Sequence, residues 1–215
     1  MCHAVEQYLV PIIGLDKARE TANFSKEAFA RLLPGLPDVG GESNRNQINV
    51  LQAGWLAAIF TGMKKQGLSA EAAGRLFYDL CESDLKATSV EKLRAEGEAY
   101  FSSENYEYLR NWAHWTQKRT YPGDWVAKVV FGNGEDFDVG HDYSECGAVK
   151  YFKSQNMSAI APYFCLADFS YSRYQHTGLA RSMTIAQGDP ICNFRYKRGR
   201  IVTQNWDTET PRFKL

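Results

Sequence analysis

The feature of this chain that most constrains its fold is a change of pattern at the turn Tyr121-Pro122-Gly123-Asp124. Before the turn, apolar residues recur every three or four positions, as they do on amphipathic helices. After it, residues 125–131 are largely β-branched and aromatic, and the Gly132-Asn133-Gly134 turn predicts a return strand through Phe137 and Val139. We therefore predict an α+β fold in which a helical N-terminal half precedes a small antiparallel sheet with two helices packed on it.

Residues 1–120 are predicted to form a helical lead. The prolines and glycines of 34–41 cannot continue a helix, whereas Ser69 and the sequence Thr88-Ser89-Val90-Glu91 are typical of helix starts. Residues 1–15 form a mixed lead-in that ends at Gly14. We expect helices over about 17–33, 46–66, 69–81 and, with an interruption, from 90 to 118.

Residues 121–200 are predicted to be the α+β part that carries the site, and 201–215 a polar tail that frays. Within this part we expect helices over 144–154 and 158–176, and strands over 179–186 and 191–197. A chain of 215 residues suits one domain and can bury a core without cross-links, so we expect a single domain over 1–215.

The charge balance limits the classes of partner. Lys and Arg number 25, as do Asp and Glu, so the formal net charge is zero, which argues against a nucleic-acid or anionic-membrane partner. No apolar run is long enough to span a membrane, and the N-terminus lacks the pattern of a signal peptide. We expect a cytoplasmic protein with a small-molecule substrate and five reduced cysteines, and a homo-oligomer remains open.

Residues that could perform chemistry gather between 140 and 199. Cys165 and Asp168 are three apart on a predicted helix and should share one face. Cys146 directly follows Glu145. A thiolate that attacks an electrophilic carbon needs a neighbouring acid or base, so these four residues are the catalytic candidates.

Candidates for substrate binding follow from the predicted strands. Alternation places Cys192, Phe194 and Tyr196 on one side of the last strand, with Asn193 and Arg195 on the other. Two guanidinium groups on one side would suit a carboxylate ligand, because each can bind it with two hydrogen bonds. The substrate-binding candidates are Arg181, Thr184, Arg195, Cys192 and Asp142.

Two other interpretations of the cysteines stay open beside catalysis. A metal could be held by Cys146, Cys165, Asp168 and Cys192, although there is no CxxC pair and the spacings of 19 and 27 residues match no familiar zinc pattern. The sequence requires no cofactor. Alternatively, the thiols simply pack a core. His141, beside Asp142, is predicted to lie in a surface turn.

Taken together, these segments resemble a known family, the L-2-amino-thiazoline-4-carboxylic acid hydrolases. The resemblance runs over most of the chain and departs at Asn193, where the family usually has aspartate. It rests on Leu36-Pro37-Asp38-Val39-Gly40-Gly41, Gly140-His141-Asp142-Tyr143-Ser144-Glu145-Cys146-Gly147, Cys165-x-x-Asp168-Phe169, Arg181-x-x-Thr184, Gly188 and Cys192-x-Phe194-Arg195.

The resemblance implies a hydrolase that opens a carbon–nitrogen bond in a cyclic amidine-like ring and yields a carbamoyl-cysteine. An arginine would hold the carboxylate of the substrate, a thiolate or an activated water would attack the ring carbon, and Asp168 or Glu145 would move protons. The alternatives are a tailoring enzyme that acts on another cyclic metabolite and a non-catalytic module that binds a small ligand.

Overall fold

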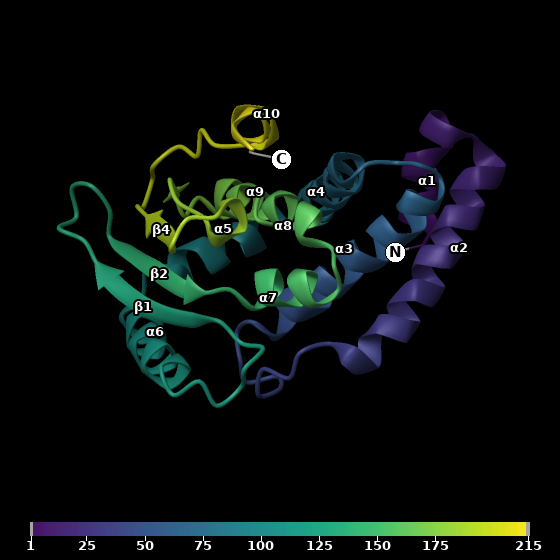
Figure 1. Cartoon of the computed structure of the whole chain (residues 1–215). Helices are drawn as coiled ribbons and strands as arrows, with labels where there is room; N and C mark the ends of the chain where they lie inside the picture. The colour runs from purple at the N-terminus through teal and green to yellow at the C-terminus, as the bar shows by residue number, and fades with distance from the viewer. Residues whose placement is uncertain (1, 214–215) are drawn as a thin grey trace.

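The computed structural model describes residues 2–213, and side chains from residue 3 onward. It has the predicted α+β fold, with helices through the N-terminal half and a small antiparallel sheet after residue 125 (Figure 1). The helices are α1 (Cys2–Ile13), α2 (Leu15–Leu32), α3 (Gln47–Lys65), α4 (Ala70–Ala87), α5 (Val90–Tyr100), α6 (Ser103–Thr116), α7 (Gly147–Ser154), α8 (Ala161–Phe164), α9 (Ala167–Gln175) and α10 (Trp206–Glu209). The strands are β1 (Val126–Phe131), β2 (Val139–Glu145), β3 (Leu179–Ala180) and β4 (Cys192–Tyr196).

Serine caps set the starts of three helices. The hydroxyls of Ser69, Ser89 and Ser102 each accept a hydrogen bond from the backbone N–H three residues later, which satisfies an N–H that the helix itself leaves free. The predicted starts at 69 and 90 are therefore confirmed. The prediction of an irregular lead-in before Gly14 was wrong. Residues 2–13 form the helix α1, and Gly14, with φ of 81°, separates it from α2.

The sheet has the order β1-β2-β4-β3 within the described residues, and each neighbouring pair is antiparallel. Tyr143 pairs with Cys192, and His141 pairs with Phe194. Because partners in register point to the same side, these four side chains share one face of the sheet. We call this the inner face, and the predicted alternation along β4 is confirmed.

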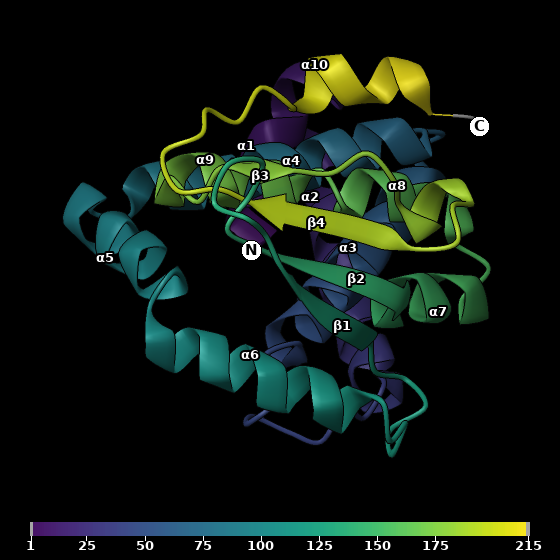
Figure 2. The same cartoon turned by 90° about the vertical axis from the view of Figure 1, so that its left-hand side faces the viewer.

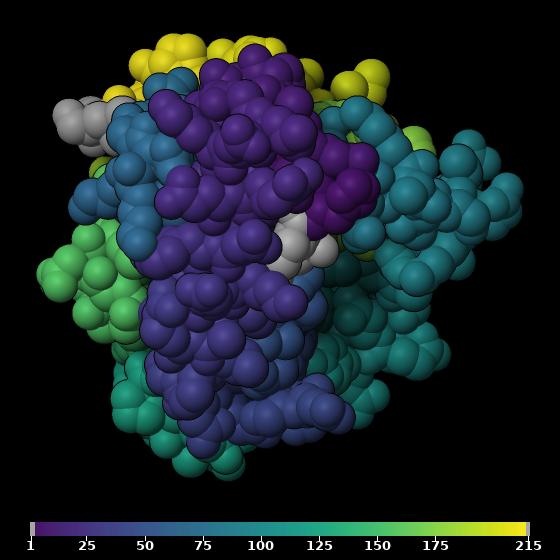
Figure 3. Space-filling model, turned by 90° about the vertical axis from the view of Figure 1, so that its right-hand side faces the viewer, coloured from purple at the N-terminus to yellow at the C-terminus, as the bar shows by residue number. Residues whose placement is uncertain are grey.

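Helices cover the inner face and leave the outer face open. Viewed from the side of the sheet, β1, β2 and β4 lie in front, with α3, α4 and α9 behind them and α6 along the β1 edge (Figure 2). Leu109 and Trp112 of α6 pack against Ala127 and Val139. Helices α1 and α2 form the opposite side of the molecule (Figure 3). No helix within residues 2–213 combines the length and apolar character that crossing a membrane would need.

Three local expectations for the C-terminal part were wrong. The predicted helix 158–176 is broken between α8 and α9. The strand expected over 179–186 ends at Ala180, because the Asn193 side chain accepts the backbone N–H groups of Ser182 and Met183 in place of a strand partner. The tail is packed rather than frayed over 201–213, since Val202 and Trp206 are buried against Tyr78 and Tyr163, and its last two residues lie outside the described part of the chain.

Gly97 allows α5 to contact α9. A Cβ added at Gly97 would lie 1.8 Å from the carbonyl oxygen of Gln175. We expect Gly97→Ala to lower the free energy of unfolding by about 1–3 kcal/mol, because overpacking at a backbone contact outweighs the helix preference of alanine. Chemical denaturation of both proteins measures the difference.

The matched control is Gly35→Ala. An added Cβ at Gly35 meets nothing within 4 Å, so this variant should stay within about 0.5 kcal/mol of the parent. A Gly97→Ala protein as stable as the parent would show that α5 does not pack on α9 in this way.

Candidate active site

A cavity of about 440 Å³ opens between the inner face of the sheet and helices α3, α5 and α9. Its volume lies within the range of sites for small organic molecules. Cys146, Cys165 and Cys192 all line it, although they are 19 and 27 residues apart in the sequence. The described fold therefore brings the three patterned cysteines to one place.

The Arg181 side chain in the cavity wall is fixed by two hydrogen bonds and two aromatic rings. Its guanidinium donates to Asp168 Oδ2 at 2.6 Å and to the carbonyl oxygen of Cys165 at 2.9 Å. The rings of Phe169 and Phe194 each lie 4.8 Å from it. The side chain is only 4% exposed, so Arg181 cannot swing toward a ligand without breaking these contacts.

Asp168 is the accessible partner of this ion pair. Its side chain is 42% exposed and lines the cavity, and within residues 3–213 only Oδ2 accepts a hydrogen bond. The surrounding protein raises the pKa of the Asp168 carboxyl, and the Arg181 guanidinium offsets part of that rise. Asp168 Oδ1 is therefore placed to exchange a proton with a molecule in the cavity.

The three thiols come from different local structures. Cys165 lies in the break between α8 and α9, Cys146 precedes the first residue of α7, and Cys192 begins β4. The hydroxyl of Thr184 lies 3.9 Å from Cys165 Sγ and 3.6 Å from Cys192 Sγ, so it links two of them. Cys192 Sγ also accepts the backbone N–H of Ile185 at 3.2 Å.

Burial controls the acidity of two of these thiols. It raises the pKa of Cys146 to about 12 and that of Cys165 higher still, despite the nearby Arg181. Both are therefore protonated thiols at neutral pH. Within residues 3–213, no three His, Cys, Asp or Glu side chains are placed to hold a metal ion, so the geometry gives the four-residue metal site no support.

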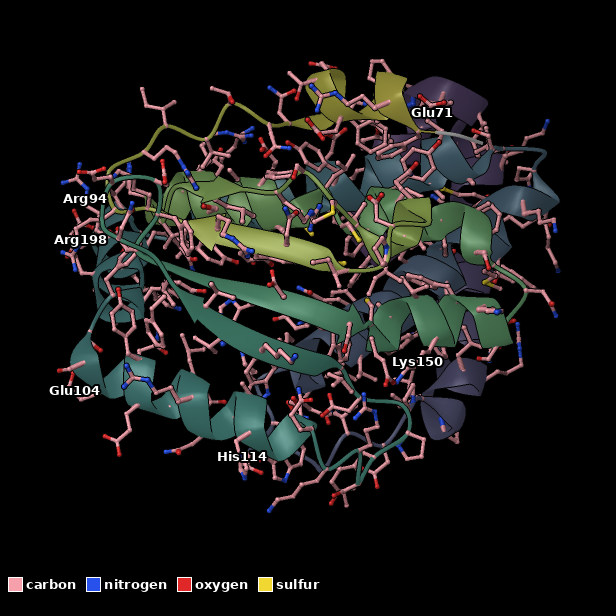
Figure 4. All side chains as sticks on the ribbon, turned by 60° about the vertical axis from the view of Figure 1, so that its left-hand side comes forward. Glu71, Arg94, Glu104, His114, Lys150 and Arg198 are labelled. Atoms are coloured by element: carbon pink, nitrogen blue, oxygen red, sulfur yellow. The ribbon has the colours of Figure 1, made fainter. Side chains whose placement is uncertain are left out.

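Four of the predicted site residues do not line the cavity: Thr184, which contacts two of its thiols, and Glu145, Asp142 and Arg195, which lie away from it. Glu145 forms ion pairs with Arg119 at 2.8 Å and Lys150 at 2.5 Å, beside a second hollow. The hydrogen bond from Lys150 lowers the pKa of Glu145 most, and the one from Arg119 lowers it further. Figure 4 labels Lys150 on α7.

Asp142 and Arg195 pair with each other at 2.7 Å on the outer face. The expectation that Arg195 could share a side with Arg181 was therefore wrong, because Arg195 alternates away from the cavity-lining residues of β4. Two guanidinium groups from these strands do not meet.

Asn193 has a structural role in this chain. It too lies on the outer face, where its amide oxygen accepts the N–H groups of Ser182 at 3.0 Å and Met183 at 2.7 Å, and its nitrogen donates to the Ser182 hydroxyl at 2.9 Å. An aspartate carboxylate could accept the same two N–H bonds. The difference from the usual family residue therefore lies in the bend after Arg181, outside the cavity.

Sequence reasoning missed a second polar group in the cavity lining. Arg45 and Tyr100 line the cavity together with Tyr196, and the buried His141 ring lies 6.4 Å from the Tyr100 ring and 5.9 Å from the Tyr196 ring. His141 is buried in β2 rather than exposed in a turn, so its predicted location was wrong. The sequence signal that could have placed His141 correctly was its alternation with Tyr143, which is typical of side chains on the buried face of a strand.

The fold and the cavity thus define an α+β protein with a site lined by thiols and a buried arginine–aspartate pair. Residues 48–196 match the family described as L-2-amino-thiazoline-4-carboxylic acid hydrolase. This is more than half of the chain, which belongs to that family. Comparison with curated proteins gave no match, and comparison with solved structures gave none.

The burial of His141 makes stability depend on pH. Burial lowers its pKa well below 6.5, and the nearby Arg45 acts in the same direction. The folded protein thus keeps His141 neutral, and its contribution to stability is present above pH 6.5 and is lost as the pH falls, because the unfolded chain takes up the proton. We expect this loss to reach about 2 kcal/mol between pH 6.5 and 5.

Urea unfolding at several pH values, with parent and His141→Gln proteins, measures the effect. The variant should show a flatter decline in unfolding free energy over this range. His114→Gln is the control, since His114 is exposed on the side of α6 away from the sheet (Figure 4). Equal slopes for the parent and His141→Gln would contradict the prediction.

Proposed function

We propose that this chain is a hydrolase that opens a small ring of the cyclic amidine class, with 2-amino-thiazoline-4-carboxylate as the first candidate substrate. The family supports hydrolysis. The observation that carries the proposal is the convergence of Asp168 and three thiols on one cavity, with Arg181 fixing the carboxylate. Such a site can bring a proton-transfer group against a reacting carbon.

In the proposed reaction, one water adds to the amidine carbon. Its oxygen bonds to that carbon, and one of its protons passes by way of Asp168 Oδ1 to the ring nitrogen. The carbon–nitrogen bond then breaks as the hydroxyl becomes a carbonyl, and Asp168 carries the hydroxyl proton to the departing nitrogen, which leaves as the amine. The product equals substrate plus one water and carries a free amine, with the carbamoyl group on sulfur.

For Cys165, direct attack on the amidine carbon is the competing route. Burial keeps its thiol protonated at neutral pH, so a thiolate there would first have to lose its proton to Asp168. This favours attack by water, with Cys165 shaping the pocket. Both routes pass the proton through Asp168, and they differ in whether the carbon is bound to sulfur before water arrives.

The test incubates the reduced protein with 2-amino-thiazoline-4-carboxylate and looks by mass spectrometry for the addition of one water. We expect Asp168→Asn to lower the turnover rate by at least about 100-fold, because the amide cannot accept the proton. Asp79→Asn is the control, since Asp79 is also paired with an arginine, Arg75 at 2.9 Å, and lies outside the cavity. Full activity in a folded Asp168→Asn protein would refute this role.

Two further measurements separate the routes. Turnover by Cys165→Ala within about tenfold of the parent supports attack by water, whereas complete loss with a folded protein supports attack by the thiol. A thiol reagent tests the bond that breaks, because carbon–sulfur cleavage would release a free thiol and carbon–nitrogen cleavage would not. If neither this substrate nor related rings give a product, ligand binding without catalysis becomes the better explanation.

A further inference from the structure

Arg45 is the second arginine of the cavity, and it differs from Arg181 in its pairing. Arg181 is neutralised by Asp168. Among residues 3–213, no carboxylate forms an ion pair with Arg45, whose electrostatic partners are tyrosine hydroxyls. Glu96 also lines the cavity, but it is exposed and accepts a hydrogen bond from Gln175 at 2.9 Å. Arg45 therefore leaves one positive charge uncompensated inside the cavity.

The backbone around Arg45 is fixed from both sides. Asn44 and Asn46 are 5% and 2% exposed. Asn44 donates to Asp124 Oδ2 at 2.8 Å, and Asn46 donates to Oδ1 of the same residue at 3.4 Å. The guanidinium itself lies 5.0 Å from the Trp112 ring. Arg45 is thus held at one position before it meets a ligand, which reduces the entropy that binding would cost.

Hydroxyl donors surround the same place. Arg45 interacts with the Tyr100 hydroxyl, and Tyr143 and Tyr196 are close enough to influence it electrostatically. Burial raises the pKa of Tyr100 to about 12, so this hydroxyl keeps its proton; it lies 3.5 Å from His141 Nδ1, a long contact that a carboxylate acceptor in the cavity would replace. A guanidinium with neighbouring O–H groups has the donors that a carboxylate needs for several charge-assisted hydrogen bonds.

We propose that Arg45, with the hydroxyls of Tyr100 and Tyr196, binds an anionic group of the substrate, and that this group is a carboxylate. The proposal rests on the proposed function for its reactive end, where Asp168 and the thiols would face the ring. It assigns substrate selection to Arg45, in place of Arg181 and Arg195. The substrate class is then a compact ring bearing a carboxylate, and a neutral carboxamide of the same ring binds poorly.

The first experiment uses the cavity thiols as reporters and needs no turnover. Iodoacetate and iodoacetamide alkylate thiols alike, but only iodoacetate is an anion. Alkylation at Cys146, Cys165 and Cys192 is followed by peptide mass spectrometry at pH 8.5 in the parent, Arg45→Met and Arg45→Lys proteins. We expect Arg45→Met to slow iodoacetate by about tenfold at these thiols and to change iodoacetamide by less than about twofold.

Two variants make this comparison specific. Arg45→Lys should keep part of the preference for iodoacetate, because lysine retains the charge and loses the planar fork. Arg110→Met should match the parent, since Arg110 also lies over an aromatic ring, Phe131 at 4.4 Å, but is exposed outside the cavity.

Three results would overturn the proposal. One is an unchanged iodoacetate rate in Arg45→Met. Another is an equal fall with both reagents, which would mean that Arg45 controls access rather than charge. The third is alkylation of the parent's cavity thiols by iodoacetamide but not by iodoacetate. Each can occur with or without ring hydrolysis, so failure here is distinct from failure of the proposed function.

Steady-state kinetics extends the test once a substrate turns over. Arg45→Met should raise KM for the ring carboxylate by about tenfold with kcat largely kept, because the contact is made equally in the ground and transition states. The corresponding carboxamide should show no such change. A fall confined to kcat for both compounds would place Arg45 in the chemical step and contradict a role in anion binding.

Discussion

The polar wall of the cavity depends on the contacts of one buried guanidinium. Arg181 binds the side chain of Asp168 and the carbonyl oxygen of Cys165, so it ties the start of α9 to the break that carries a thiol. Its own backbone is held by Gln204, which accepts its N–H at 2.9 Å and donates to its carbonyl at 2.7 Å. Removing the Asp168 carboxylate would leave the buried Arg181 charge without its ion-pair partner and would destabilise the fold. The Arg181 side chain therefore positions residues 165–168, and its backbone joins them to the segment around Gln204.

The two arginines of the cavity have different electrostatic roles. The charge of Arg181 is neutralised by Asp168, so Arg181 serves to position that carboxylate. Arg45 keeps its charge for a ligand, at an end of the cavity built mainly from aromatic rings. These rings exclude water and strengthen any charge-assisted hydrogen bond made there. Cys146 and Cys165, by contrast, are protonated at neutral pH, so they add polarizable surface and little charge.

Much of the fold could be predicted from periodicity and capping, because these signals are local. The start of the helix at 90, the first strand and the alternation along β4 are examples. Side-chain competition for backbone groups was harder to foresee: nothing in the pattern of 179–186 reveals that Asn193 accepts hydrogen bonds from two of its N–H groups.

In the candidate site, the thiols, Asp168 and Arg181 were found because they cluster in sequence. Arg45 was missed because it lies 101 residues before Cys146, the nearest of them in sequence, and nothing in its local pattern marks it as a site residue.

The family match spans 48–196, and two side chains outside it act on the site: Arg45, which lines the cavity, and Gln204, which holds the backbone of Arg181. The shared region thus carries the thiols and the acid, whereas the flanks carry the cation and the clamp on Arg181. If Arg45 selects the ligand as proposed, exchanging the short stretch before α3 changes the ligand preference and leaves Asp168 and the thiols in place.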